Sequence, residues 1–266
     1  MDFNSAHDFN LLSERDILFQ SSIQNSGTGA IHAVAGWNPV NAPLADPTTG
    51  IIAGVDFAND ILGVANSFGN NGAMITLDSE SRTTSIGSRG GETRVASNGV
   101  VVNGSDTTLN SGAQIGFETT GGADSTGAIQ VNALAGGVAL HGGGAEGGYA
   151  RIGHGGEDRE GDADAAITVE SAGSVALTSG AGIDSATQIG HGGKDSSGHQ
   201  QGSISVASTT GEILLDSSAG GDSAFVQIGH GGRNAAGDKG AAGESISVSA
   251  ANDVTLLSGG GTHAYA

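Results

Sequence analysis

The strongest constraint on the fold is a short sequence motif, called the repeated phrase below, that recurs at a nearly fixed interval. The sequence Ile-Gly-His-Gly-Gly occurs at Ile152–Gly156, Ile189–Gly193 and Ile228–Gly232, and a degenerate copy begins at Ile115. The isoleucines that open these copies lie 37, 37 and 39 residues apart (115 to 152, 152 to 189 and 189 to 228). A period of this length predicts a stacked repeat architecture, in which each repeat buries its apolar face only against its neighbours.

Each repeat contains three short apolar runs. Apolar residues recur at i and i+2, which is the periodicity of a strand and not of a helix. Glycine, serine, aspartate and asparagine separate the runs, as turns require. The three sets of predicted strands are Ile129–Val131, Ile167–Val169, Ile204–Val206 and Ile246–Val248; Val138–Leu140, Val175–Leu177, Ile213–Leu215 and Val254–Leu256; and Arg151–His154, Gln188–His191 and Gln227–His230.

The spacing between these runs predicts an all-β parallel β-helix (β-solenoid) with three short strands per coil. The interval from the first to the second run is 8 or 9 residues (for example 167 to 175 and 204 to 213). The interval from the third run back to the first is the most variable and holds the charged segments Glu157–Asp164, Lys194–Gln201 and Arg233–Glu244. Equivalent strands would stack about 4.8 Å apart. Three runs per repeat favour one coil with a projecting loop, although two shorter coils per repeat remain an alternative.

The chain divides into a less regular and a more regular part of one continuous solenoid. Residues 1–112 are expected to form irregular coils with a proline-containing loop at 38–50, and residues 113–266 the regular repeats. Ala6–Ser13 aligns without gaps to Ala251–Ser258, so the first part shares the sequence pattern of the regular repeats. Further strand-like runs in the first part are Asp16–Phe19, Ala30–Trp37, Ala73–Leu77, Arg94–Ser97 and Val100–Asn103.

Composition excludes several classes of protein. The chain has 49 glycines but only 3 prolines and no Gly-X-Y period, so it is not collagen. Its formal net charge of −19 argues against binding to nucleic acid or to anionic membrane surfaces. No apolar run is long enough to predict membrane insertion. With no cysteine, the chain has neither disulfides nor thiolate metal sites.

Three histidines occupy one position of the repeat. His154, His191 and His230 would lie in file about 4.8 Å apart in a stacked coil. Aligned imidazoles suggest a metal site, but no acidic or cysteine partner recurs with them, and zinc needs three or four converging ligands. Phe117 stands at the same position in the degenerate copy. We therefore interpret the file as structural packing; whether it binds anything stays open.

The acidic segment Glu157–Asp164 offers carboxylates suited to Ca²⁺. Its spacing does not match an EF-hand, and the equivalent segments begin with Lys194 and Arg233, so the feature is not periodic. We expect a solvated charged loop, with a calcium-stabilised module as the alternative. The sequence predicts no catalytic, cofactor-binding or metal-binding residue.

Enzyme activity is also not predicted. Some parallel β-helices act on polysaccharides, which requires carboxylates gathered in one groove. The acidic residues here scatter through variable loops, and a secreted polysaccharide-acting enzyme would require carboxylates from several coils to converge. Gln114, Gln188 and Gln227 share one outward position, where they are expected to hydrogen-bond along the stack with Arg151 interrupting them.

The repeat units, such as 251–266 and the phrase Gln-Ile-Gly-His-Gly-Gly of earlier copies, resemble those of filamentous-haemagglutinin-like exoproteins. These are adhesins of Gram-negative bacteria exported by two-partner secretion. The resemblance implies a right-handed parallel β-helix, an extracellular or cell-surface location, and an adhesive or scaffolding role. It also implies a host or neighbouring-cell receptor or glycan as partner.

The Asn-Pro-Asn motifs of that family's secretion domain have no match beyond Trp37-Asn38-Pro39-Val40. We therefore interpret the chain as a shaft segment of a longer protein. Uncapped coils at the ends of such a segment present unpaired strand edges, which predicts end-to-end self-association.

Overall fold

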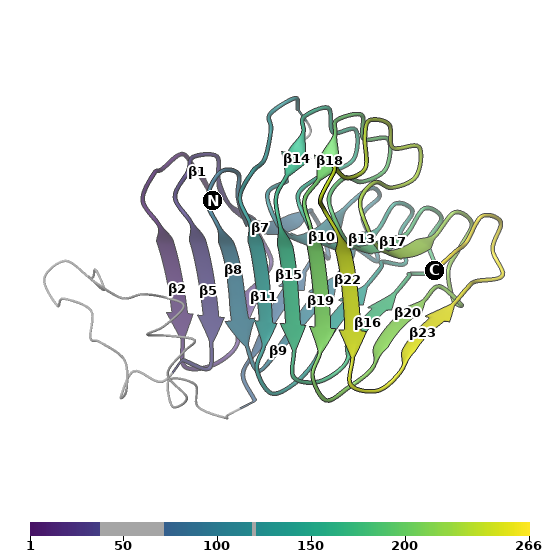
Figure 1. The fold of residues 1–266 in the computed structure, drawn as a ribbon, viewed down its shortest axis with the longest axis horizontal. Helices are drawn as coiled ribbons and strands as arrows, with labels where there is room; N and C mark the ends of the chain where they lie inside the picture. Colours follow the sequence, from purple (N-terminus) through teal and green to yellow (C-terminus); the bar gives the residue numbers. More distant parts are fainter. Residues whose placement is uncertain (38–71, 119–120) are drawn as a thin grey trace, which may run out of the picture.

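The computed structural model describes residues 1–37, 72–118 and 121–266. In these residues the chain winds into a single stack of coils, with its two termini near opposite ends (Figure 1). They contain strands but no helix, and hence no helix that could cross a membrane. The proline-containing loop predicted at 38–50 lies outside the described residues.

Each coil contributes one strand to each of three sheets, which we name A, B and C. Sheet A contains β1 (Asp2–Phe3), β4 (Ile23–Asn25), β7 (Thr84–Ser88), β10 (Gly112–Ile115), β13 (Tyr149–Ile152), β17 (Ala186–Ile189) and β21 (Phe225–Ile228). Sheet B contains β2 (Phe9–Ser13), β5 (Ile31–Ala35), β8 (Thr93–Ser97), β11 (Ile129–Ala133), β15 (Ile167–Ser171), β19 (Ile204–Ser208) and β22 (Ile246–Ala250). Sheet C contains β3 (Ile17–Phe19), β6 (Met74–Asp78), β9 (Gly99–Asn103), β12 (Val138–His141), β16 (Val175–Thr178), β20 (Ile213–Asp216) and β23 (Val254–Leu257).

All three sheets are parallel and in register. In sheet B, Ile129 pairs with Ile167, which pairs with Ile204, so identical side chains stand in file. The strand order A, B, C repeats along the chain, with each repeat making one coil. The predicted parallel β-helix with three strands per coil is confirmed, and one coil per repeat replaces the alternative of two. The right-handed sense stays a prediction.

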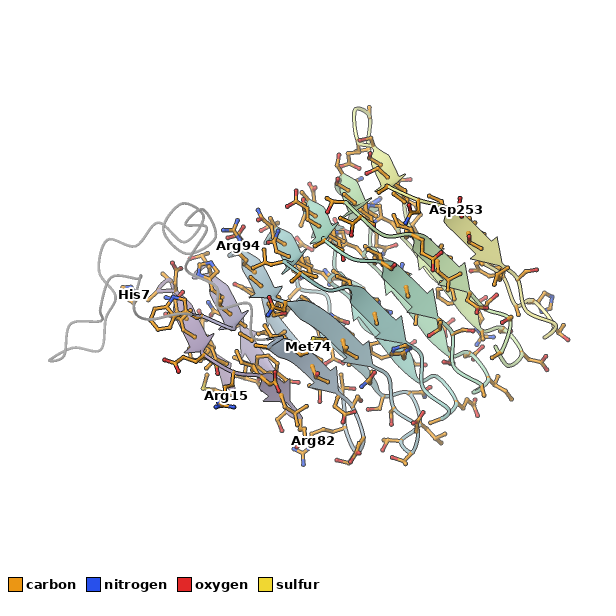
Figure 2. The ribbon with its side chains drawn as sticks, turned by 90° about the horizontal axis from the view of Figure 1, so that it is seen from below. His7, Arg15, Met74, Arg82, Arg94 and Asp253 are labelled. Carbon is orange, nitrogen blue, oxygen red and sulfur yellow. The ribbon has the colours of Figure 1, made fainter. Side chains whose placement is uncertain are left out.

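The core is a thin column inside the coils. Isoleucine, valine, leucine and alanine from all three sheets fill it, in a continuous cluster that begins with Ile17 and ends with Val226. Seen from below, the side chains project from successive strands in rows that run from the coil near His7 to the coil near Asp253 (Figure 2). Small β-branched side chains suit this thin column, in which each inward residue packs against the copies above and below it and against the other two sheets.

The coils differ in size. Strand partners in sheet A are 22 residues apart in the first coil (Asp2 to Gln24) and 37 in the regular repeats (Ile115 to Ile152). Most of the added length lies between a sheet A strand and the next sheet B strand, a connection that we call the AB loop. From the fourth coil onward the AB loops project as a ridge that carries the two-stranded pair β14 (Ala163–Asp164) and β18 (Gln200–Gln201) (Figure 1).

The runs predicted in the first part correspond to β3, β5, β6, β8 and β9, whereas β1, β4 and β7 were not predicted. The aligned segments Ala6–Ser13 and Ala251–Ser258 contribute to different sheets. Phe9–Ser13 forms β2 in sheet B, but Val254–Leu257 forms β23 in sheet C. Every strand of a coil carries the same apolar alternation, so similarity between two strands does not reveal their sheet.

Gly153 and Gly190, which follow the isoleucine of the repeated phrase, sit where the backbones of neighbouring coils lie close together. A Cβ atom on Gly153 would lie 1.9 Å from the carbonyl oxygen of Gly190, and one on Gly190 would lie 1.9 Å from that of Gly229. These glycines have φ near +155°, which side chains rarely allow. The phrase is conserved between repeats because each coil needs a bare backbone at this corner.

We predict that Gly190→Ala destabilises the fold by about 3 kcal/mol, because the added methyl group overlaps backbone of the next coil. Gly229→Ala is the matched control. Gly229 has the same φ, but the nearest atom to its added Cβ is the flexible Gln227 side chain at 3.0 Å, so a loss of about 1 kcal/mol is expected. Urea unfolding of both variants measures the difference. Equal losses would show that backbone strain, and not the contact between coils, explains the glycine.

Candidate functional site

The three histidines of the repeated phrase form a stacked file inside the corner between sheets A and B. The ring centroids of His154 and His191 are 5.1 Å apart, as are those of His191 and His230, with the rings tilted by 8° and 11°. His154 and His191 are fully buried. Phe117 occupies the equivalent place in the preceding coil and is also buried.

Both nitrogens of each imidazole ring are engaged by backbone. Nδ1 of His154 accepts from the N–H of Phe117 at 2.9 Å, and Nδ1 of His191 accepts from the N–H of His154 at 2.9 Å. Nε2 of the same two rings lies 2.6 Å from the carbonyl oxygen of Gly127 and 2.8 Å from that of Ala165. Because an N–H only donates and a carbonyl only accepts, the geometry fixes the neutral tautomer with hydrogen on Nε2. No lone pair is left to bind a metal.

Burial also holds the file uncharged. It lowers the pKa of His154 to about 4, and it lowers the pKa of His191 well below the ordinary value, with His154 adding to the effect. The three stacked histidines therefore join successive coils through hydrogen bonds to their backbone. Within the described residues, no three histidine or carboxylate side chains come together as a metal site.

We predict that the fold loses stability as pH falls from about 6.5 toward 4. The folded-state pKa of these histidines is depressed, so their contribution is complete above the unfolded pKa of about 6.5 and is lost as the unfolded chain gains protons. For His154 the loss by pH 5 is on the order of 2 kcal/mol, from roughly 1.5 pH units at about 1.36 kcal/mol each. Urea unfolding at pH 7.5 and pH 5 measures it.

His191→Phe is the matched control for this titration, because phenylalanine already fills the equivalent place at Phe117. The variant has lower stability at pH 7.5, since the N–H of His154 and the carbonyl of Ala165 lose their partners. Its stability should nevertheless change less with pH than that of the unaltered chain. An identical pH dependence would contradict a contribution from His191.

The AB loops fold back over the outer face of sheet A. Gln114, Arg151 and Gln188 point away from the core as predicted, but they are buried beneath this cover. Arg151 does not interrupt the glutamine file. Its Nη1 donates to Gln114 Oε1 and its Nε donates to Gln188 Oε1, both at 3.2 Å, so it joins the two amides. The alternation of inward and outward residues in the sequence predicted that these side chains point outward. It did not predict that a loop covers them.

The acidic segment Glu157–Asp164 is not a wholly solvated loop, because Arg159 is fully buried within it. The guanidinium donates to the carbonyl oxygens of Gly161 at 2.7 Å and Ala123 at 3.4 Å, and to that of Asp162. Burial lowers the pKa of Arg159 to about 10, a value at which it remains charged at neutral pH. The interior of the loop therefore holds the positively charged guanidinium group of Arg159.

The carboxylates of this segment turn away from one another. Glu157 pairs with Lys194 at 3.0 Å, and Asp162 Oδ1 accepts from the N–H of His199 at 2.8 Å. These contacts link the loop to the next coil. Calcium binding at this segment stays an untested alternative, with its carboxylates divided between different partners.

We predict that Arg159→Leu lowers the free energy of unfolding by about 3 kcal/mol, because buried carbonyl groups lose their donor. Arg82→Leu is the control, since Arg82 is exposed and its loss should change stability by less than about 0.5 kcal/mol. Thermal unfolding compares the two.

Calcium tests the alternative reading of the same segment. Adding calcium should leave the unfolding midpoint of the unaltered chain unchanged; a rise in the midpoint would favour the calcium-stabilised alternative.

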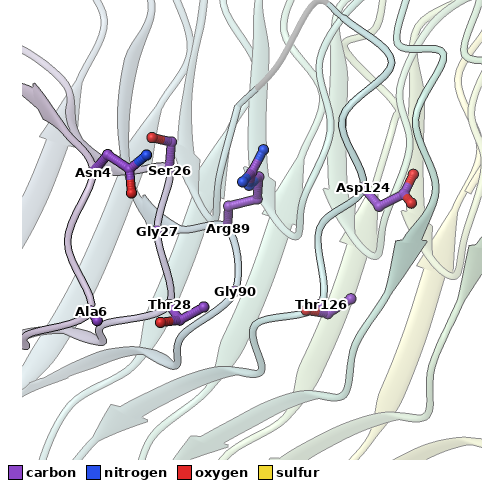
Figure 3. A pocket seen from close by; sticks show the side chains of 9 residues that line it. All are labelled: Asn4, Ala6, Ser26, Gly27, Thr28, Arg89, Gly90, Asp124 and Thr126. Carbon is purple, nitrogen blue, oxygen red and sulfur yellow. The ribbon is translucent and has the colours of Figure 1, made fainter.

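A groove lies where the projecting AB loops begin. The first three coils have short connections from sheet A to sheet B, so the ridge of loops ends in a step. A hollow of about 540 Å³ occupies this step. Figure 3 shows its lining residues. They are Asn4, Ala6, Ser26, Gly27, Thr28, Arg89, Gly90, Asp124 and Thr126.

The floor and the wall of the groove are joined by backbone. The N–H groups of Thr126 and Gly127 donate to the carbonyl oxygen of Arg89 at 2.8 and 3.0 Å. Asp124 Oδ1 accepts from the N–H of Asp162 at 3.0 Å, which ties the wall to the following loop. The groove is therefore held in shape by the stack itself.

A second hollow of about 470 Å³ continues the first, with Asn4 and Ser26 lining both. It adds Asp2, Phe117 and Glu118. Burial raises the pKa of Glu118, and its Oε1 accepts a hydrogen bond from the hydroxyl of Tyr149 at 3.2 Å. Asp2 and Glu118 come from the first and fourth coils, so carboxylates of different coils do line one groove. The sequence did not predict this, because it does not show which residues of different coils the loops bring together.

The last coil exposes core residues. Ile246, Val254 and Leu256 are 53%, 48% and 58% exposed, whereas their partners in the preceding coil are almost completely buried. This open face is compatible with the predicted end-to-end self-association, which stays a prediction.

Comparison with models of protein families, with curated proteins and with solved structures gives no match to this chain. The resemblance to filamentous-haemagglutinin-like exoproteins therefore remains a prediction, as do the secretion route and the location that it implies.

Proposed function

We propose that the chain is a rigid, non-catalytic segment of a bacterial surface or secreted adhesin. Its role is to hold binding surfaces in a fixed arrangement outside the cell. The observation that carries the proposal is the in-register stack, which repeats the same coil while the AB loops vary in length and charge.

Rigidity follows from the way in which the coils are joined. Every strand shares a backbone ladder with the coil before or after it, and the histidine file and Arg151 add polar side-chain contacts along the same axis. Buried polar networks of this kind fix one register, because a shift of one residue would leave their donors and acceptors unpaired. A shaft that presents ligand-binding surfaces to another cell requires such stiffness.

The charge of the surface agrees with an extracellular role that does not involve nucleic acid or insertion into a membrane. The net charge is −19, and two of the basic residues, Arg151 and Arg159, are buried in hydrogen-bonded positions. The basic side chains left at the surface are too few to neutralise a phosphate backbone. We infer that the partner is a receptor or glycan on a host or neighbouring cell.

The adhesion of protein-coated beads tests this function. Fluorescent beads carrying the folded chain are expected to bind cultured epithelial cells or bacterial cells at least tenfold more than beads carrying albumin or the heat-unfolded chain. Binding no greater than that of albumin beads to all cells would overturn the adhesive role. Release of new reducing ends from the cell-surface polysaccharide would overturn the non-catalytic role and favour the polysaccharide-acting alternative.

A further inference from the structure

We propose that the groove at the step of the solenoid binds an extended, neutral, β-linked polysaccharide. This inference rests on the proposed adhesive function and names its ligand class. The groove is defined by the residues of its first hollow, from Asn4 to Thr126, and by Asp2, Phe3, Gln24, Phe117 and Glu118 of its continuation.

The groove presents polar groups in a row along the stack. Asp2 and Phe3 pair with Gln24 and Asn25, and Asn25 pairs with Ser88, so Asn4, Ser26 and Arg89 follow one another in successive coils. Figure 3 shows these three side chains in line, with Asp124 of the loop wall continuing the row. The coils set the repeat of this row at about 4.8 Å.

The spacing of about 4.8 Å along the polar row favours extended ligands whose units recur at a similar distance. Successive rings of an extended β-linked polysaccharide recur at close to the distance between coils. Side chains on one face of an extended peptide recur at about 6.6 Å, the length of two strand residues. Within a few residues they would no longer coincide with polar groups that recur at about 4.8 Å. A ligand with a ring at every coil can therefore use each polar group of the row.

Asn4 and Arg89 of the row, and Thr28 beside it, are available to a ligand, whereas Ser26 Oγ donates to the carbonyl oxygen of Phe3 at 3.2 Å and Asp124 Oδ1 accepts from the N–H of Asp162. In the described part of the chain, no hydrogen bond engages the side chains of Asn4, Thr28 or Arg89, and Asn4 and Thr28 are exposed. Amide, hydroxyl and guanidinium groups donate and accept in the directions that sugar hydroxyls require. Gly27 and Gly90 leave the floor between them free of side chains.

The ends of the groove favour a neutral sugar. Asp2, Glu118 and Asp124 line the groove against the single basic residue Arg89, so an acidic polysaccharide would meet mostly like charge.

Isothermal titration calorimetry with hexasaccharides of β-1,4-linked glucose, N-acetylglucosamine, mannose and xylose tests the proposal. We expect at least one to bind the full chain with a dissociation constant below 1 mM. The triple variant Asn4→Ala/Thr28→Ala/Arg89→Ala should bind that sugar at least tenfold more weakly with an unchanged unfolding midpoint. Thr168→Ala, on the outer face of sheet B, is the control and should bind as the unaltered chain does.

Three outcomes would overturn the groove assignment. They are binding of none of the four sugars at 1 mM, equal binding by the triple variant, and tighter binding of an acidic hexasaccharide or an extended peptide than of any neutral sugar. Beads coated with the triple variant separate this inference from the proposed function. If those beads adhere to cells as well as the unaltered beads do, the adhesive role stands and the groove is not its site.

Discussion

The structure depends on one constraint, which is that every coil must match the coil above and the coil below at the interstrand distance. The constraint is severe at the corner where Gly153 and Gly190 face the next backbone, because a single methyl group would overlap a carbonyl oxygen there. It acts equally on the column of isoleucine, valine and leucine within the coils. Repetition in the sequence follows from it, since a residue that fits between two coils fits between the next two.

The same constraint explains why polar side chains can be buried here with hydrogen-bond partners. Histidine at the corner accepts from the backbone of one coil and donates to another segment, so both ring nitrogens have partners. Arg151 spans two neighbouring coils, and Arg159 fills the interior of a loop with donors for carbonyl groups. In each case the polar group stabilises contact between coils; the sequence predicted structural packing for the histidines but a solvated loop for the segment that buries Arg159.

We place the proposed binding site where the repetition stops. A regular stack offers the same surface at every coil, but the change from short to long AB loops creates a step with an open hollow. The groove there combines residues from four coils that are widely separated in the sequence, such as Asn4 and Asp124. The polar groups of the groove have the same spacing as the coils. This spacing is the reason why the architecture favours one class of extended ligand.

The sequence by itself determined the period, the three strands of each regular coil and the inward residues. A strand alternates with a period of two, and stacked copies must keep their spacing. It did not determine the sheet to which β2 belongs, because all strands share that alternation. The burial of Gln114 and Arg159 and the convergence of Asp2 with Glu118 were decided by the tertiary structure. They depend on where loops of different length fold against neighbouring coils, and that is a property of the stack and not of any one repeat.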